Sequence, residues 1–351
     1  MSDVSMSTII RTRPDYTHDA PEPGTLIELA PGILWLRLAL PFALNHVNIH
    51  IIDDGTGWTI IDSGVADDRT RAVWEDMLAG PLAGRPVNRL IVTHFHPDHV
   101  GLAGWLAEKL DVGVTMSQSE YLQSRLSRDR SGGVDSNVHR DFYARHGLSD
   151  DDIHAVTVRG DSYQRLTVDL PVNYTRIRAG DVLNLGGRRF EVMTGAGHAL
   201  EQVMLLCRDE AIFLPTDQVI GHISPNVGVH AIEPEADALA DFLASLRDLR
   251  ATVPENVLTA PAHGRPFHGL HARIDTLLAY HRERCDLLAN AIKHGATTTA
   301  GIMPTLFNRK LDAHQMGFAF GEALAHVNHM LALGELRGEP DRDGVLRLSL
   351  I

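Results

Sequence analysis

Cysteine, positive charge and long apolar runs are all scarce in this sequence. Only 2 of its 351 residues are cysteines, which excludes a disulfide framework and is typical of a reducing compartment. The 32 Lys and Arg residues stand against 45 Asp and Glu, and the formal net charge of −13 argues against a general nucleic-acid binder. No apolar run approaches the roughly 18 residues of a membrane span, and residues 1–24 contain no signal-peptide stretch. We therefore expect a cytoplasmic protein without a membrane partner.

Histidine, by contrast, is abundant, with 20 copies in a composition of 44% apolar and 22% charged residues that is otherwise ordinary. A chain of 351 residues can bury an ample core as one large domain, or as a large domain and a small one. We expect residues 1–24 to form a partly ordered tail bound to the surface. The excess of histidine directs attention to metal chemistry, because neutral imidazole is the commonest metal ligand in proteins.

From residue 25 onward, short apolar segments alternate with helical patterns, which predicts an α+β fold. Helices are expected over 67–78 and 235–249, and another beginning near Gly101. Strands are expected as pairs within 26–40 and 46–62, and singly at 89–92, 113–116, 182–185, 189–194, 202–207, 211–215 and 256–260.

The polar segment 117–178 interrupts this rhythm and reads as a helical insertion over the core. It carries nine Lys and Arg and nine Asp and Glu residues, so it has no net charge. Its aromatic side chains either line a substrate pocket or pack a helix against the core: Tyr121, Phe142, Tyr143 and Tyr163. Three histidines of the insertion are expected to be solvated: His139, His146 and His154.

Residues 276–351 have the order of a winged-helix-like domain. Helices are predicted over 277–292 and 299–307, and a third amphipathic helix follows from the spacing of Met316, Phe320, Leu324, Val327 and Leu331. An alternating strand at 345–350 closes a terminal hairpin.

One loop concentrates metal-binding residue types. After the expected strand 89–92 the sequence reads Thr93-His94-Phe95-His96-Pro97-Asp98-His99, which places three imidazoles and one carboxylate within six residues. In a loop at a strand end, these side chains can converge on an ion, and imidazole with carboxylate suits zinc, iron or nickel. Burying these four polar side chains together without a bound ion would carry a desolvation cost.

Four more residues follow apolar strands in the same manner: Asp62, His198, Asp217 and His263. Each stands where a strand gives way to small residues, which is a common place for functional groups in α/β enzymes. Any one of them alone would be read as a structural residue.

Taken in order, Asp62, the His94-x-His96-x-Asp98-His99 loop, His198, Asp217 and His263 resemble the motifs of the metallo-β-lactamase superfamily over residues 25–275. The resemblance implies a four-layer αββα sandwich with a site for two metal ions at one edge. It assigns His94, His96 and His198 to the first ion, Asp98, His99 and His263 to the second, and Asp217 to both. Asp62 is expected to orient the ligand loop.

The expected chemistry is hydrolysis with a metal-bridging hydroxide as nucleophile, because divalent ions lower the pKa of water to about 7 and polarise carbonyl or phosphoryl oxygens. Asp98 is expected to orient that nucleophile or take its proton. The two divalent ions are expected to be zinc, while iron, manganese and nickel also suit such a donor set.

Several branches of the superfamily differ at individual positions. Secreted zinc β-lactamases lack the bridging aspartate present here as Asp217, and flavodiiron proteins carry glutamate at the position of His96. Glyoxalase II shares all seven ligands but differs after Gly197-His198 and in its C-terminal part. Persulfide dioxygenases use the same loop with a single iron, so one-metal chemistry stays open.

Two functions fit a winged-helix-like C-terminal domain on such a core: hydrolysis of a small ester, thioester or lactone, or an endoribonuclease or nucleic-acid-binding role. The expected recognition helix, 314–333, contains no Lys or Arg, although phosphate contacts need cations. We therefore expect a small-molecule substrate and a C-terminal module used for packing or for a homodimer.

Overall fold

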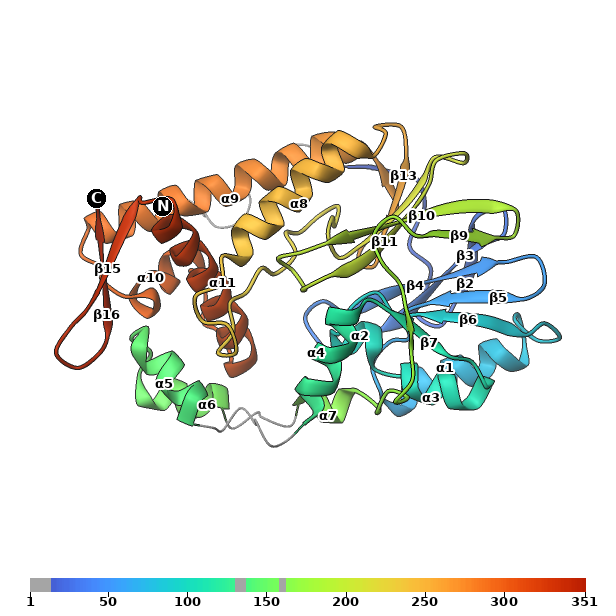
Figure 1. Ribbon diagram of the computed structural model, residues 1–351, viewed down its shortest axis with the longest axis horizontal. Helices are drawn as coiled ribbons and strands as arrows, with labels where there is room; N and C mark the ends of the chain where they lie inside the picture. Colours follow the sequence, from blue (N-terminus) through green and yellow to red (C-terminus); the bar gives the residue numbers. More distant parts are fainter. Residues whose placement is uncertain (1–13, 130–136, 158–161) are drawn as a thin grey trace.

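The computed structural model describes residues 14–129, 137–157 and 162–351, and it contains two seven-stranded sheets that face each other (Figure 1). Sheet I runs in the order β2 (Leu26–Ala30), β3 (Ile33–Ala39), β4 (His46–Asp53), β5 (Trp58–Ile61), β6 (Val87–Ile91), β7 (Val114–Met116) and β8 (Thr175–Arg176). Sheet II runs in the order β1 (Asp15–Tyr16), β14 (Phe267–His268), β13 (Leu258–Pro261), β12 (Ile212–Thr216), β11 (Gln202–Cys207), β10 (Arg188–Gly195) and β9 (Val182–Leu185).

Helices cover both outer faces, which confirms the expected αββα sandwich (Figure 1). Sheet I is covered by α1 (Asp68–Ala79) and α3 (Ala103–Leu110), and sheet II by α8 (Ala238–Thr252) and α9 (Leu270–Lys293). Three apolar cores separate the four layers, as each sheet buries both of its faces. Trp35 and Phe190, both fully buried, belong to the core between the sheets.

The apolar runs of the sequence account for most strands. The predicted strand at 202–207 coincides with β11, and the pairs predicted in 26–40 and 46–62 are β2–β3 and β4–β5. Part of the N-terminal segment is bound as a strand, because Asp15–Tyr16 pairs with Phe267–His268 and extends the edge of sheet II. Two-residue strands of this kind carry no periodicity, so the sequence does not reveal them. The rest of the predicted tail, residues 1–13, lies outside the described residues.

The insertion forms α4 (Gln118–Arg128), α5 (Asn137–Arg145), α6 (Asp150–Thr157) and α7 (Ser162–Leu166). Its helices lie in two different places. Helices α4 and α7 lie beside residues 93–99, called the His-rich loop below. Helices α5 and α6 pack into the core formed with α8, α9 and α11 (Ala313–Ala332). The rings of Phe142 and Tyr143 lie 5.7 and 5.0 Å from that of Phe320, which is helix packing rather than pocket lining.

One histidine of the insertion differs from its expected state. His154 is exposed as predicted and His139 is half-buried, but His146 is only 4% exposed. Its ring lies 5.6 Å from Phe142 and 6.2 Å from Phe320. The prediction that His146 is solvated was wrong, because the spacing along one helix does not show that a distant helix covers it.

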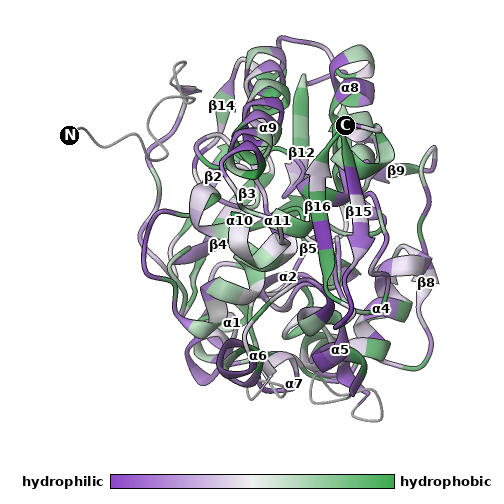
Figure 2. Ribbon diagram, turned by 90° about the vertical axis from the view of Figure 1, so that its left-hand side faces the viewer, coloured by the Kyte–Doolittle hydropathy of each residue, from purple (hydrophilic) through white to green (hydrophobic). Residues whose placement is uncertain are grey.

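The C-terminal part consists of α9, α10 (Thr299–Leu306), α11 and an antiparallel hairpin of β15 (Leu336–Pro340) and β16 (Leu346–Leu350). Figure 2 looks onto this end of the molecule, with α10, α11 and the hairpin in front of the sheets. The three expected helices and the strand at 345–350 are confirmed, although the expected boundary between residues 275 and 276 falls inside the continuous α9. Among the described residues, no helix has both the length and the apolar character needed to cross a bilayer.

Candidate metal centre

All seven predicted ligands lie at one edge of the sandwich. Strands β10, β12 and β13 point the same way in sheet II, since β12 is parallel to β13 and both β10 and β12 are antiparallel to β11. Their carboxyl ends deliver His198, Asp217 and His263. From sheet I, the parallel strands β5 and β6 end before Asp62 and the His-rich loop.

The first group of donors, called site 1 below, consists of His94, His96 and His198. Nδ1 of His96 lies 3.0 Å from Nε2 of His94 and 3.1 Å from Nε2 of His198. One ligand atom from each of the three side chains lies within 4.8 Å of the other two. The structure therefore brings together two residues of one loop and a third that is 102 positions away in the sequence.

The second group, called site 2, consists of Asp98, His99 and His263, and Asp217 lies between both groups. The short helix α2 (Pro97–Val100) turns Asp98 and His99 toward the site. Oδ2 of Asp98 is 3.4 Å from Nε2 of His263. Oδ2 of Asp217 is within 4.0 Å of Nε2 in four histidines: His94, His99, His198 and His263.

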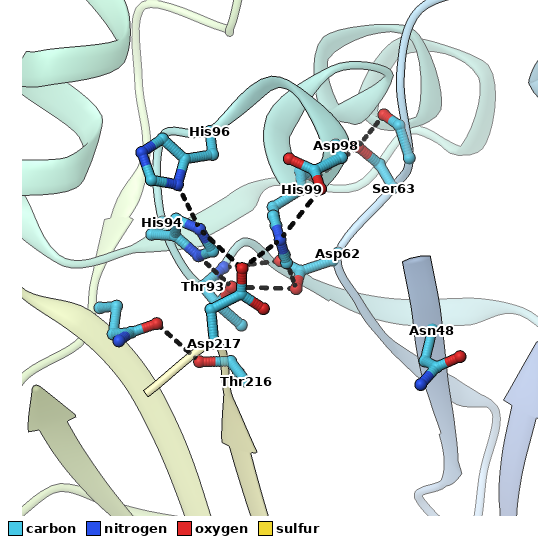
Figure 3. Close-up of polar contacts among 12 residues, drawn as sticks. Asn48, Asp62, Ser63, Thr93, His94, His96, Asp98, His99, Thr216 and Asp217 are labelled. Atoms are coloured by element: carbon cyan, nitrogen blue, oxygen red, sulfur yellow. Dashed lines mark hydrogen bonds and ion pairs between the residues drawn. The ribbon is translucent and has the colours of Figure 1, made fainter. Parts of the chain in front are cut away.

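The outward nitrogen of four imidazoles is held by a hydrogen bond, and Nδ1 of His94 lies 3.0 Å from the hydroxyl of Thr93. Nδ1 of His99 donates to the carboxylate of Asp62 at 2.8 Å (Figure 3). Nδ1 of His198 donates to the carbonyl of Asn226 at 2.8 Å, and Nδ1 of His263 to that of His46 at 2.7 Å. Such partners fix the ring orientation and leave Nε2 unprotonated toward the centre, as metal ligation requires.

Burial and charge set the protonation of the site. Burial, together with the neighbouring imidazoles, holds the pKa of His94 and of His96 well below the usual histidine value. Burial also acts to lower the pKa of His263, but the carboxylates of Asp217 and Asp98 raise it to about 10. For Asp217, burial acts to raise the pKa, and His263 and His99 outweigh it and hold that pKa well below the usual value. The two carboxylates thus need nearby positive charge, which protons or metal ions can supply.

Two buried polar atoms at the centre lack a hydrogen-bond partner among the described residues: Nε2 of His99 and Oδ1 of Asp217. Buried polar atoms are normally satisfied, so an orphaned nitrogen and an orphaned oxygen in the middle of the donor groups call for a bound species. The five imidazoles and two carboxylates form overlapping groups of three side chains each. These donor types are the ones that zinc, iron, manganese and nickel prefer. The residues present therefore fit divalent metal ions.

Asp62 and two residues of β4 support the ligand loops. The two carboxylate oxygens of Asp62 accept from the main-chain N–H and the hydroxyl of Thr93, at 2.8 and 2.9 Å. Nδ2 of Asn48 donates to the carbonyls of Pro261 and Gly264, on either side of His263. Nε2 of His46 accepts from the N–H of Gly264 at 2.8 Å.

Asn48 and His46 were not predicted from the sequence. A signal for them exists, because His46, Asn48 and His50 alternate with Val47, Ile49 and Ile51 in β4. The polar residues of that strand therefore share one face of a buried sheet, where each one needs a partner.

Comparison with known proteins agrees with this geometry. A family model described as "Metallo-beta-lactamase superfamily" matches residues 43–263, and one described as "Metallo-beta-lactamase-like, C-terminal domain" matches residues 285–351. The first range includes all seven predicted ligands, from His94 to His263, and Asp62.

Similar proteins extend over most of the chain. It is 23% identical over 281 residues to the "Probable metallo-hydrolase YqjP" of Bacillus subtilis, covering 78% of this chain and 85% of that protein. The "Lactamase-like protein vrtG" of Penicillium aethiopicum is also 23% identical over 281 residues, covering 80% of this chain and 68% of that protein.

Among solved structures, a beta-lactamase domain protein from Burkholderia ambifaria is 38% identical with a TM-score of 0.87, covering 96% of this chain and 97% of that chain. A metallo-beta-lactamase family protein from Thermus thermophilus is 25% identical with a TM-score of 0.77, covering 92% of this chain and 100% of that chain. Coverages of 96% and 92% of this chain are too large for the sandwich alone, so the likeness extends into the C-terminal part.

Proposed function

The chain belongs to the metallo-β-lactamase superfamily, and we propose that it is a dinuclear metal-dependent hydrolase of a small ester, thioester or lactone. Site 1, site 2 and the shared Asp217 are the proposed ligands of the two ions. The observation that carries this proposal is the position of Oδ2 of Asp217, 3.2–3.4 Å from imidazole nitrogens of both groups. A carboxylate so placed suits a bridging role between two cations.

Divalent ions at such a centre supply hydroxide at neutral pH, by lowering the pKa of water to about 7, and polarise the carbonyl to be attacked. The chain adds a proton acceptor in Asp98, whose side chain is 17% exposed while that of Asp217 is 6% exposed. Burial acts to raise the pKa of Asp98, but His99 and His263 hold it well below the usual value. Asp98 is thus ionised at neutral pH and more accessible than Asp217, so it can accept a hydrogen bond from an attacking water and orient it, or take its proton, for which its low pKa makes it a weak base.

The preference for a small substrate rests on charge. The sequence of α11 contains no Lys or Arg, and a protein that binds nucleic acid needs cations against the phosphates. We propose that the C-terminal part packs against the hydrolase core, where α9 and α11 share one apolar cluster with α8, and that a homodimer would form through its outer face. Zinc is the proposed metal.

Metal analysis followed by a hydrolysis screen on one preparation tests the proposal. Two zinc ions per chain are expected, with turnover of a thioester, ester or lactone that is lost on chelation and restored by Zn²⁺. His96→Ala is expected to remove one ion and to lower turnover by roughly a hundredfold or more. As a matched control, His154→Ala replaces an exposed histidine of α6 and is expected to change neither quantity.

Other outcomes decide between the alternatives. Full turnover after chelation would contradict metal-dependent hydrolysis. One tightly bound iron with consumption of oxygen would replace hydrolysis by one-metal chemistry. Cleavage of RNA without turnover of any small substrate would support the alternative hypothesis, that the protein is an endoribonuclease.

A further inference from the structure

A buried carboxylate on the insertion contacts both segments that carry site 1. Glu120, on α4, has no exposed surface. Its Oε2 accepts the main-chain N–H of Phe95 at 2.9 Å, and its Oε1 accepts that of Glu201 at 2.6 Å. Burial raises the pKa of Glu120, while the N–H groups of Glu201 and Phe95 oppose that rise. A buried carboxylate is costly, so its presence here calls for a role.

The two N–H groups that bond to Glu120 belong to the segments that carry the ligands of site 1. Phe95 stands between His94 and His96, and Glu201 follows His198 by three residues. The single carboxylate of Glu120 therefore bridges two segments that are about a hundred residues apart in sequence and that together supply every side chain of site 1.

The carbonyls of the same two residues are also held by the insertion. The hydroxyl of Tyr163, from α7, donates to the carbonyl of Phe95 at 2.7 Å. The hydroxyl of Ser117, which precedes α4, donates to the carbonyl of Glu201 at 2.8 Å. Both main-chain groups of Phe95 and of Glu201 are thus fixed by side chains of one segment, with Glu120 as the member common to both.

Site 2 depends on different supports. Its His99 is held by Asp62, which follows β5, and its His263 by the main chain of His46 in β4. None of these contacts involves α4. Loss of the Glu120 carboxylate should therefore loosen the geometry of site 1 and leave that of site 2 nearly unchanged.

We propose that Glu120 is a positioning residue that sets the spacing of the two ligand segments of site 1 and so determines the affinity of this site for its metal ion. The proposal rests on the proposed metal centre, and it concerns binding rather than turnover. Residues that orient metal ligands typically contribute about 10- to 100-fold to metal affinity. In Glu120→Gln the amide keeps one acceptor but turns an N–H₂ donor toward a main-chain N–H, so one of the two bonds is lost.

The test measures Zn²⁺ affinity at each site separately, by titration of metal-free protein in a chelator buffer. In a His263→Ala background only site 1 is complete, and in a His96→Ala background only site 2 is complete. Glu120→Gln is expected to raise the Zn²⁺ dissociation constant about tenfold or more in the first background, and less than about twofold in the second. Equal losses in both backgrounds, or none in either, would overturn the proposal.

Two further variants separate positioning from a general loss of structure. Glu201→Gln also changes a carboxylate that contacts α4, because Oε2 of Glu201 accepts from the hydroxyl of Ser119 at 2.9 Å, but it keeps the Glu120 bonds. It is expected to leave both affinities within about twofold. If Glu120→Gln does not fold, Tyr163→Phe replaces it, with a smaller loss expected and the same selectivity for site 1. An equal effect of Tyr163→Phe on both sites would then refute the proposal.

The same preparations keep the two proposals apart. If the wild-type chain binds Zn²⁺ but hydrolyses none of the small substrates, the proposed function fails, and the Glu120 proposal is still decided by the affinities. If the His263→Ala background binds no Zn²⁺ at all, site 1 is not a metal site and both proposals fail.

Discussion

Oδ2 of Asp62 accepts a hydrogen bond from Nδ1 of His99 at 2.8 Å, while Nε2 of the same ring has no hydrogen-bond partner among the described residues and lies 3.4 Å from Oδ2 of Asp217 (Figure 3). The carboxylate thus fixes which nitrogen of His99 carries the proton. Asp62 occupies a left-handed backbone conformation (φ 68°), which residues other than glycine rarely adopt. The strained turn after β5 is what aims the carboxylate at the ligand loop.

Replacing that carboxylate is expected to weaken metal binding at site 2. In Asp62→Asn the amide can still accept from the main-chain N–H of Thr93, but its N–H₂ faces the Thr93 hydroxyl and Nδ1 of His99 and cannot accept a proton from either. The preferred tautomer is then reversed, and we expect roughly a 10- to 100-fold loss of Zn²⁺ affinity, measured by titration of metal-free protein. Asp76→Asn on the exposed side of α1 is the matched control. An unchanged affinity in Asp62→Asn would show that the hydrogen bond does not orient His99.

Removing one partner of a buried ion pair in the C-terminal part is expected to lower the free energy of unfolding strongly. Arg284 and Glu322 lie 3.1 Å apart with side chains 6% and 12% exposed. Arg284→Met leaves Glu322 buried without its cation, which costs about 3–5 kcal/mol. Urea unfolding of metal-free protein measures this loss.

The same helix provides a matched control. Arg282 pairs with Glu335 at 2.8 Å, but its side chain is 58% exposed, and such pairs contribute about 0–1 kcal/mol. Arg282→Met is therefore expected to change the free energy of unfolding little. The double variant Arg284→Met with Glu322→Met should recover most of the stability, because it removes the unpaired charge. Equal losses in Arg284→Met and Arg282→Met would contradict this account.

Acidification is expected to destabilise the fold through buried neutral histidines. Burial, and to a lesser degree Arg145, lowers the pKa of His146 to about 4, against about 6.5 in an unfolded chain. Between these values the unfolded chain binds a proton that the folded chain does not. The stability from this group is therefore complete above about pH 6.5 and is lost as the pH falls toward about 4.

A non-titrating residue at this position should reduce the pH dependence. Between about pH 7 and about pH 5, His146→Gln is expected to lose about 2 kcal/mol less free energy of unfolding than the wild type. Chemical unfolding of metal-free protein at the two pH values measures the difference. His154→Gln, on the exposed side of α6, should retain the wild-type pH dependence. A parallel fall in wild type and His146→Gln would show that His146 does not remain neutral.

The C-terminal part is expected not to bind nucleic acid. In α11 the only carboxylate is Glu322, and no Lys or Arg offsets it, so phosphates would find no cation there. Fluorescence anisotropy with labelled RNA and DNA at low salt should show no binding. Binding that weakens steeply as salt is added would contradict this expectation and favour the endoribonuclease hypothesis.

The sequence predicts some elements of the structure better than others. The apolar run 202–207 predicts β11 with its observed bounds, since a short apolar segment between turn residues has few other structures available. The motif order from Asp62 to His263 predicts the αββα fold, which the structure confirms. For the four aromatic residues of the insertion, the sequence left pocket lining and helix packing both open, and the contacts of Phe142 and Tyr143 with Phe320 decide for packing at these two positions.

The sequence by itself determined the candidate metal ligands, because imidazole and carboxylate groups at strand ends are visible as residue types and spacings. Only the tertiary structure decided how those groups are held. Glu120, Asn48 and Asn226 bond to residues of ligand loops 25 to 216 positions away, and no local pattern encodes such a pairing. His146 became a buried neutral group for the same reason, since its burial depends on α11, which folds over it from the other end of the chain.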